Sequence, residues 1–367
     1  MKVSVITRHA ITNYGSLLQS LATQIVLNNM GYDCETVDYI RSDESYWRCE
    51  KTILNRKSEW NNNAVKKAIY LALRVPESVI AGRRFERTRH SILSLSDIYT
   101  SEESLNNNPP EADVYVTGSD QVWGPTADGS VDSAYCLSWV PDGKKKVSYA
   151  ASFGRTDMND DMATYFKRWL GRYDYISVRE DSAVKLVSEW GISAKQVLDP
   201  TLLLKEQDWT DYIVKNRHGK YVLVYQLHND KELGEYAKKV ADDLGLPLIR
   251  VSATFHQIIR PGKFIFCPDV KEFLSLIKNA ECMVTDSFHG TAFAINFHTA
   301  FVEKLPGNNT ETRNVSILKL TGLEERILSD NDDISLARKS IDWERVDDIL
   351  SVERGKSLEI LKNMIEG

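Results

Sequence analysis

One short segment of the chain combines a hydroxyl, an imidazole and a glycine at the point where an apolar run ends. The run 282–285 turns directly into a helical pattern that Asp286 or Ser287 can cap, with His289, Gly290 and Thr291 in its first turn. A helix N-terminus presents N–H groups and a positive dipole that suit a phosphate, and a glycine lets a ligand approach the backbone. An imidazole there can donate or take a proton near neutral pH. The segment indicates phosphate binding with proton transfer or, with equal support, a capped helix with an incidental histidine.

A second segment places a fixed cation at the end of a strand pattern. Residues 175–178 read as a strand, and Arg179 follows directly, before a helical pattern begins. At that position its guanidinium can hold a carboxylate or a phosphate with two parallel hydrogen bonds. An ion pair with Glu180 or Asp181 explains the same residue about as well.

A third segment is rich in groups that suit the hydroxyls of a sugar. After the apolar residues 114–117 come Gly118, Ser119, Asp120, Gln121 and Trp123. The polar side chains can donate to and accept from hydroxyls, and an indole can stack on a sugar face. A plain turn followed by a core tryptophan is the alternative. Asn13, before the first helical pattern, has the corresponding place and is either a further acceptor residue or a simple helix cap.

These side chains need a scaffold, and strand patterns alternate with helical patterns twice along the chain, at 3–199 and at 221–303. Such alternation predicts an α/β fold with parallel sheets that are covered on both faces. The 367 residues suit two domains. We expect an N-terminal domain at 1–205 with a helical insertion at about 41–110, a linker at 205–220, a C-terminal domain at 218–330 and a helical segment at 331–367. A cleft between the two halves, at the carboxyl ends of both sheets, is the expected ligand site.

Composition and missing motifs exclude several classes of function. The formal net charge of −6 lacks the basic field of most nucleic-acid binders. The chain has no GxGxxG, GxxxxGK[ST], HExxH or GxSxG motif, and its five scattered cysteines form no metal-ligand pair. Neither a signal peptide nor an apolar run of membrane-spanning length is evident. We therefore expect a cytoplasmic protein with reduced thiols, no bound metal and no nucleic-acid partner.

An acidic triplet and four histidines are explained without a functional role. The triplet Asp330, Asn331 and Asp332 fits the DxD pattern of metal-dependent nucleotide-sugar enzymes, but an acidic loop favours a solvated helix start. Four histidines lack ligand spacing and are expected to be structural or at the surface: His9, His228, His256 and His298.

Taken together, six segments resemble the polysaccharide pyruvyl transferase family. They are residues 13–19, 118–123, 149–154, 177–180, 198–201 and 286–291. The resemblance implies a GT-B-like fold of two facing Rossmann-like domains. It also implies transfer of a pyruvyl group from phosphoenolpyruvate to two hydroxyls of a sugar, forming a cyclic ketal, in the synthesis of a surface or capsular polysaccharide. Phosphoenolpyruvate is then the donor substrate, and no cofactor is needed.

The resemblance also assigns roles to single residues. Arg179 matches the family's arginine at a strand end, and His289 matches its histidine. Some members carry an arginine two residues before that histidine, where this chain has Ser287. Arg313 can replace that missing cation, although a surface ion pair explains Arg313 at least as well.

The predicted insertion is locally basic. Between residues 64 and 89 there are seven basic side chains (Lys66, Lys67, Arg74, Arg83, Arg84, Arg87, Arg89) and two acidic ones (Glu77, Glu86). A basic amphipathic surface can rest on anionic lipid, which would suit a lipid-linked oligosaccharide acceptor and a peripheral place at the inner face of the membrane. A solvated helical face is the alternative.

Two other functions share many of these features. A GT-B glycosyltransferase would have the same fold but would bind a nucleotide sugar. A non-catalytic carbohydrate-binding scaffold, which the Ser287 departure allows, would bind sugar without releasing phosphate.

Overall fold

The computed structural model describes residues 1–367 except 127–128, 308–310 and 330–332, so the triplet at 330–332 lies outside the described residues. The chain divides into two compact units. The first unit comprises Met1–Pro200 and Ser357–Gly367, and the second comprises Thr201–Lys356. The division falls at Pro200 rather than in the expected linker at 205–220. That stretch contains the 3-10 helix η2 (Glu206–Tyr212) and belongs to the second unit.

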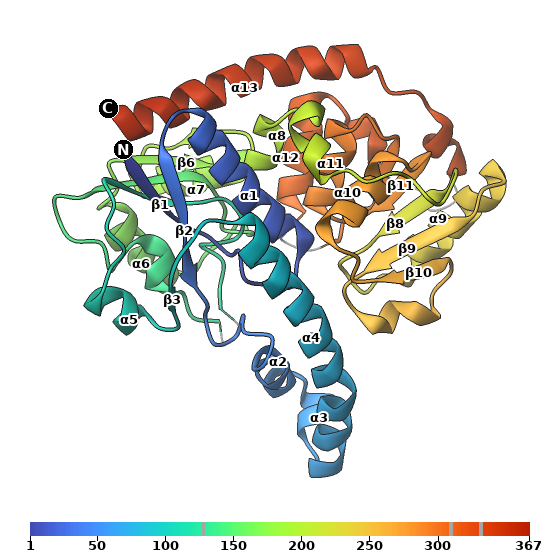
Figure 1. The fold of residues 1–367 in the computed structure, drawn as a ribbon, viewed down its shortest axis with the longest axis horizontal. Coiled ribbons are helices and arrows are strands. Elements are labelled where there is room, and N and C mark those ends of the chain that lie inside the picture. The colour runs from blue at the N-terminus through green and yellow to red at the C-terminus, as the bar shows by residue number, and fades with distance from the viewer. Residues whose placement is uncertain (127–128, 308–310, 330–332) are drawn as a thin grey trace. The chain divides into compact units, whose positions relative to one another are not determined.

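The first unit contains a seven-stranded sheet with the order β3-β2-β1-β4-β5-β6-β7 (Figure 1). Every neighbouring pair of strands is parallel. The strands are β1 (Lys2–Ile6), β2 (Asp33–Tyr39), β3 (Leu95–Tyr99), β4 (Val114–Thr117), β5 (Lys145–Ala151), β6 (Tyr175–Val178) and β7 (Lys195–Gln196). The helices are α1 (Tyr14–Asn29), α2 (Cys49–Arg56), α3 (Ser58–Asn61), α4 (Ala64–Ile92), α5 (Glu102–Asn107), α6 (Asp160–Leu170) and α7 (Asp181–Glu189), with the 3-10 helix η1 (Ser133–Cys136).

The expected insertion at 41–110 is only partly separate from the sheet. The segment 64–92 is α4, one helix of 29 residues that continues through Pro76. Residues 95–99 form β3, which pairs with β2 as the edge strand of the sheet. Only the last residue of β3 is buried, so the strand lacks the apolar run by which buried strands are recognised.

The second unit contains a five-stranded parallel sheet with the order β10-β9-β8-β11-β12. Its strands are β8 (Val222–Tyr225), β9 (Leu248–Ser252), β10 (Lys263–Phe266), β11 (Cys282–Thr285) and β12 (Phe301–Glu303). Its helices are α8 (Pro200–Leu203, which begins at the last residue of the first unit), α9 (Lys231–Leu244), α10 (Val270–Lys278), α11 (Phe288–Asn296) and α12 (Thr312–Thr321), with η2, η3 (Phe255–Ile259), η4 (Glu324–Arg326) and η5 (Ile334–Arg338). The central strands β8 and β11 are buried at every position, as expected for strands covered on both faces. The predicted α/β class with two parallel sheets is confirmed.

The last helix, α13 (Trp343–Glu366), begins in the second unit, and its final turns belong to the first. The backbone N–H of Leu198 donates to the Ser357 hydroxyl at 3.0 Å, and the Tyr32 hydroxyl donates to Glu366 at 2.8 Å. The C-terminal segment is therefore an integral part of the first unit.

Candidate functional site

Both sheets end in polar loops at their carboxyl edges, and these loops hold most of the predicted site residues. In the first unit the loops follow β1, β4, β5 and β6. In the second unit they follow β8 and β11. Ligands of parallel α/β sheets bind at this edge, because the helix N-termini and the loops converge there.

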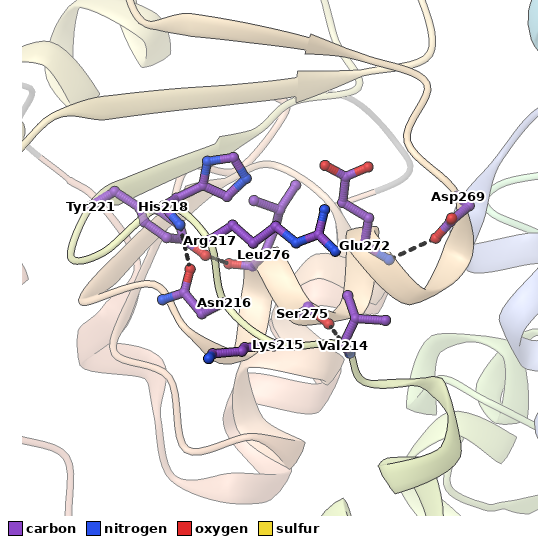
Figure 2. Close-up of a pocket in the computed structure, with 10 residues that line it drawn as sticks. All are labelled: Val214, Lys215, Asn216, Arg217, His218, Tyr221, Asp269, Glu272, Ser275 and Leu276. Atoms are coloured by element: carbon purple, nitrogen blue, oxygen red, sulfur yellow. Dashed lines mark hydrogen bonds between the residues drawn. The ribbon is translucent and has the colours of Figure 1, made fainter.

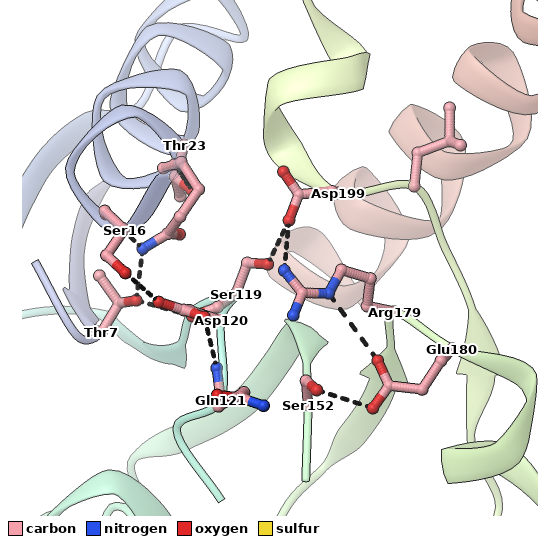
Figure 3. A network of polar contacts seen from close by, with 12 residues as sticks. Thr7, Ser16, Thr23, Ser119, Asp120, Gln121, Ser152, Arg179, Glu180 and Asp199 are labelled. Carbon is pink, nitrogen blue, oxygen red and sulfur yellow. Dashed lines mark hydrogen bonds and ion pairs between the residues drawn. The ribbon is translucent and has the colours of Figure 1, made fainter. Parts of the chain in front are cut away.

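Arg179 is the centre of a buried ion-pair network in the first unit (Figure 3). Its Nη1 donates to Asp199 Oδ2 at 2.8 Å, and its Nε lies 3.8 Å from Glu180 Oε2. The hydroxyl of Ser119 donates to the same Asp199 oxygen at 2.8 Å. Burial by itself would lower the pKa of Arg179, but the carboxylates of Asp199, Glu180 and Asp120 raise it above its ordinary value. The structure therefore realises the ion pair that the sequence offered as an alternative, with Asp199 as the main partner instead of Asp181.

Asp120 ties the loop after β4 to the first helix. The Ser16 hydroxyl in α1 donates to Asp120 Oδ2, and the backbone N–H of Gln121 donates to Oδ1 at 2.8 Å. Asp120 has a φ of 77°, in the left-handed region that aspartate adopts more readily than most residues. Asn13 caps α1 by accepting from the Ser16 N–H at 3.3 Å. Asn13, Ser119 and Asp120 thus lie near one another along the loops that end β1 and β4.

Two neighbours in the loop after β4 have packing roles. Trp123 is 1% exposed, and its ring packs against Phe153 with centroids 5.0 Å apart. A buried indole cannot stack on a sugar, so the predicted acceptor role of Trp123 is wrong and the core position offered as the alternative is correct. A Cβ on Gly118 would lie 3.0 Å from Val5 and 3.1 Å from Thr7, so this glycine allows close packing of the loop on β1. Gln121 is half-buried and keeps its polar side chain.

In the second unit, Ser287 caps α11 at the carboxyl end of β11. Its Oγ accepts the N–H of Gly290 at 3.2 Å, and its carbonyl accepts the N–H of Thr291 at 2.9 Å. The predicted strand, turn and helix are confirmed here. His289 is in the first turn, as expected, and is 7% exposed.

The roles expected for Gly290 and Thr291 as ligand contacts are not supported by their surroundings. A Cβ on Gly290 would lie 2.7 Å from Thr285 Oγ1 and 3.1 Å from Tyr225 Cδ1, so the glycine lets α11 pack on the sheet. The Thr291 hydroxyl donates to Glu303, a fully buried carboxyl group on β12. We therefore replace the predicted ligand-binding roles of Gly290 and Thr291 with packing roles, because both residues hold α11 against the sheet.

Arg313 lies in the first turn of α12, next to Asn314, and is half-buried. The Asn314 amide donates to Glu303, the same carboxyl group that accepts from Thr291 in α11. The structure thus brings the helix that carries Arg313 beside the predicted phosphate-binding helix. Burial raises the pKa of Glu303 well above its ordinary value, and the hydrogen bonds from Thr291 and Asn314 offset this only in part.

His228, which was expected to be structural or at the surface, lies at the carboxyl edge of the second sheet, and its ring is oriented by Asp286. Asp286 is 3% exposed and accepts the backbone N–H groups of Leu227 and His228 at 2.7 and 2.9 Å. Its Oδ2 also lies 3.2 Å from Nδ1 of His228, whose side chain is 35% exposed. A carboxylate on Nδ1 fixes the tautomer and directs Nε2 elsewhere. The partners are 58 residues apart, so no local spacing could have predicted this pair.

Two arginines that were not predicted as site residues, Arg250 and Arg260, converge at the end of β8. Arg250 in β9 is fully buried and donates to Gln226 Oε1 at 3.0 Å, and Arg260 donates to the same oxygen at 2.9 Å. Burial and the neighbouring Arg260 lower the pKa of Arg250 to about 10. This edge therefore carries two arginine side chains beside the Asp286 carboxylate, and Arg260 is half-buried.

A cavity of about 220 Å³ lies elsewhere in the second unit, between the segment 214–221 and α10 (Figure 2). Its lining includes Arg217, His218, Asp269 and Glu272 but none of the predicted site residues. Among the described residues there is no group of three or more His, Cys, Asp or Glu side chains placed to hold a metal ion. Over the same residues, no helix is both long and apolar enough to cross a bilayer. None of the five cysteines, which all lie in the described part of the chain, forms a disulfide, and four of them are buried.

The chain was compared with known protein families. The model of the polysaccharide pyruvyl transferase family matches residues 13–302, a stretch that includes Asn13, the Arg179 network and α11. This chain belongs to the polysaccharide pyruvyl transferase family. In this pyruvyl transferase family member the match includes all of the predicted site residues except Arg313, which lies beyond residue 302.

Solved structures are similar in fold. The Methanocaldococcus jannaschii UDP-GlcNAc 2-epimerase in complex with UDP-GlcNAc and UDP has a TM-score of 0.51 and 17% identity, with 100% of each chain covered. The S. aureus MnaA–UDP structure has a TM-score of 0.52 and 15% identity, covering 100% of this chain and 96% of the other. At these identities the likeness shows the fold alone, which is of the GT-B-like type. No curated protein sequence matches this family member.

Proposed function

We propose that the protein transfers a pyruvyl group from phosphoenolpyruvate to two hydroxyls of a sugar, forming a cyclic ketal, in the synthesis of a surface or capsular polysaccharide. The observation that carries the proposal is the family match over residues 13–302, which includes β2 to β7 of the first unit and nearly all of the sheet of the second unit. In this proposal the acceptor is a sugar or a lipid-linked oligosaccharide, and the protein acts in the cytoplasm.

The donor phosphate is assigned to the N-terminus of α11, where Ser287 caps the helix. The positive end of the helix dipole and the arginines at the end of β8 both favour a negative group there. Arg179 is assigned to one of the donor's anionic groups. Arg179 already donates to Asp199 through Nη1, so the donor would share this guanidinium, which has five N–H groups, with that carboxylate.

Proton transfer is assigned to His289, in the first turn of α11. As an acid it protonates C3 of phosphoenolpyruvate, which makes C2 electrophilic; as a base it takes the proton of the attacking hydroxyl. One sugar hydroxyl adds to C2, and its proton balances the one that C3 has received. The C2–O bond to phosphate then breaks, the second hydroxyl adds to C2 to close the ring, and its proton leaves with the phosphate. The products are the ketal and inorganic phosphate. His228, oriented by Asp286, is a second proton carrier in the same unit.

The test is to incubate the protein with phosphoenolpyruvate and a panel of terminal hexosides while measuring phosphate release and the pyruvyl mass gain of the sugar. We expect both signals for at least one sugar. His289→Ala is expected to lower the rate by about 100-fold or more, as is typical for loss of an acid–base group. A near-normal rate in that variant would remove His289 from the scheme.

The same samples test the alternatives. A nucleotide-sugar glycosyltransferase would be stabilised against heat by UDP or GDP and not by phosphoenolpyruvate. A carbohydrate-binding scaffold would bind sugar and release no phosphate. Either result would contradict the proposal.

A further inference from the structure

The first half of α4 carries an apolar stripe that faces solvent. Val65, Ile69, Leu73 and Ile80 are 66%, 47%, 67% and 44% exposed. Their spacing of four, four and seven residues places them on one face of the helix. The residues by which α4 packs on the rest of the first unit, among them Ala81 and Phe85, lie on the opposite side. The packing of α4 on the first unit therefore leaves the stripe exposed to solvent.

The stripe is on a part of the unit that extends past the sheet. In Figure 1 the first half of α4 lies away from β1, β2 and β3, with α2 and α3 beside it. Of the residues 64–76, only Tyr70 is buried, and its hydroxyl donates to Glu50 in α2 at 2.8 Å. The short helices α2 and α3 thus support one side of α4 and leave the stripe uncovered.

Basic side chains continue the face toward the C-terminal end of α4. Arg83, Arg84 and Arg87 are exposed, and Arg83 and Arg87 follow Ile80 at steps of three and four residues, on the same face. The α4 sequence has seven Lys and Arg residues and two Glu, an excess of five positive charges in a chain whose net charge is −6.

The two acidic side chains of α4 are engaged within the unit. Glu77 is buried and accepts from Arg74 at 2.8 Å, and Glu86 accepts from the Tyr46 hydroxyl at 2.9 Å. Neither belongs to the exposed stripe, so the face that carries the stripe is apolar in its first half and basic toward the C-terminal end of α4.

Two exposed tryptophans belong to the same part of the unit. Trp47 is 50% exposed, and its ring lies 5.1 Å from the Arg83 guanidinium. Trp60, in α3, is 36% exposed and packs beside Tyr70. Tryptophan beside basic residues is typical of helices that lie at the boundary between lipid headgroups and acyl chains.

We propose that this surface binds an anionic lipid bilayer. We call it the α4 face and define it by Val65, Ile69, Leu73, Ile80, Arg83, Arg84 and Arg87. The apolar residues would enter the headgroup boundary while the arginines, whose long stems let their charged ends reach the phosphates, contact the lipid headgroups. A second copy of the same face would bring arginines against arginines or bury them against the apolar stripe, and both arrangements are unfavourable, so lipid is the occupant that the charges favour. The proposal does not depend on the proposed activity.

Flotation with vesicles tests the proposal on the full chain. The vesicles contain phosphatidylcholine alone or phosphatidylcholine with phosphatidylglycerol. We expect binding to the anionic vesicles at low salt, weaker binding at high salt, and little binding to phosphatidylcholine alone. The double variant Ile69→Glu, Leu73→Glu is expected to bind at least about tenfold more weakly. The triple variant Arg83→Gln, Arg84→Gln, Arg87→Gln is expected to lose a similar factor and much of its salt dependence.

Val352→Glu in α13 is the matched control, because Val352 is 56% exposed and lies outside the α4 face. It should bind like the wild type. All altered positions are exposed, so circular dichroism and the melting temperature should be unchanged. No binding of the wild-type protein to anionic vesicles, or equal binding of the double variant, would overturn the proposal. The proposal would also fail if light scattering showed that the wild-type protein is a dimer and that the double variant is a monomer.

Discussion

At the scale of single residues, the main question is which side chain supplies the cation near His289. Some family members carry an arginine two residues before this histidine. Ser287 occupies that position and caps α11. Two arginines of the second unit are candidates to replace it. Arg260 converges with Arg250 on Gln226 at the end of β8, and Arg313 lies in the first turn of α12.

We expect Arg260→Gln to raise KM for phosphoenolpyruvate more than Arg313→Gln does. A charge-assisted hydrogen bond contributes about 1.5–3 kcal/mol, so the expected rise is roughly 10- to 100-fold. Steady-state kinetics with varied donor concentration, under the proposed activity, measure it. If Arg313→Gln gives the larger rise, the cation comes from α12; if neither changes KM, the donor phosphate does not bind at this edge.

The buried carboxyl group of Glu303 gives a prediction that needs no activity. Because burial raises its pKa in the folded state, the folded protein holds this proton more tightly than the unfolded chain does. Its contribution to stability is complete below the unfolded pKa of 4.5 and is lost as the pH rises toward the folded value. One such group changes the free energy of unfolding by at most about 1.4 kcal/mol per pH unit.

Glu303→Gln should remove this dependence, because an amide resembles the protonated acid in shape and does not titrate. Urea unfolding at a series of pH values from mildly acidic to neutral would show the wild-type protein losing stability relative to the variant as the pH rises. Parallel pH profiles for the two proteins would mean that Glu303 is already ionised in the folded state.

At the scale of elements, α11 is held against the sheet by the absence of a side chain at Gly290. A Cβ there would be 2.7 Å from Thr285 Oγ1. Gly290→Ala should therefore lower the free energy of unfolding by about 1–3 kcal/mol, although alanine favours helices. Gly355, in α13, has no atom within 4 Å of the corresponding position.

Gly355→Ala is thus the matched control and should stabilise the protein by about 0.5–1 kcal/mol. Chemical denaturation of both variants measures the difference. An equal effect of the two substitutions would show that α11 can shift on the sheet without cost, and the correction of Gly290 to a packing role would then fail.

Several elements could be predicted from the sequence, and their exceptions have a common cause. The strands β8 and β11 were found because continuous apolar runs mark strands that are buried on both faces. The strand β3 is at the edge of its sheet and only its last residue is buried, so it lacks that run. A proline inside a helix usually interrupts it, but α4 continues through Pro76. Patterns of burial thus reveal the centre of a sheet better than its edges.

At the scale of the whole molecule, the chain returns to its first unit at the C-terminus. Leu361, Met364 and Ile365 are buried, and they lie in the segment 357–367 that belongs to the first unit. The Lys145 ammonium also donates to the Ile365 carbonyl at 3.0 Å. The stability of the first sheet should therefore depend on residues that follow the second sheet in the sequence.

Leu361→Ala is expected to lower the free energy of unfolding by about 2–5 kcal/mol, as is usual for a large buried side chain. Val352→Ala, at an exposed position of the same helix, should change it by less than about 0.5 kcal/mol. Hydrogen exchange would locate the effect, with faster exchange expected in β1 and β5 than in β8 and β11. Faster exchange confined to the second unit would contradict the assignment of this segment.

The sequence by itself determined the alternation of strands and helices, the cap and first turn of α11, and the set of motifs that identifies the family. These depend on residues close together in the chain, where spacing and local hydrogen bonds suffice. Only the tertiary structure decided that Arg179 pairs with Asp199, that Asp286 orients His228, and that Trp123 is in the core. Parallel strands are joined by long crossovers, so neighbours at a sheet edge are distant in sequence, and their partners cannot be read from spacing.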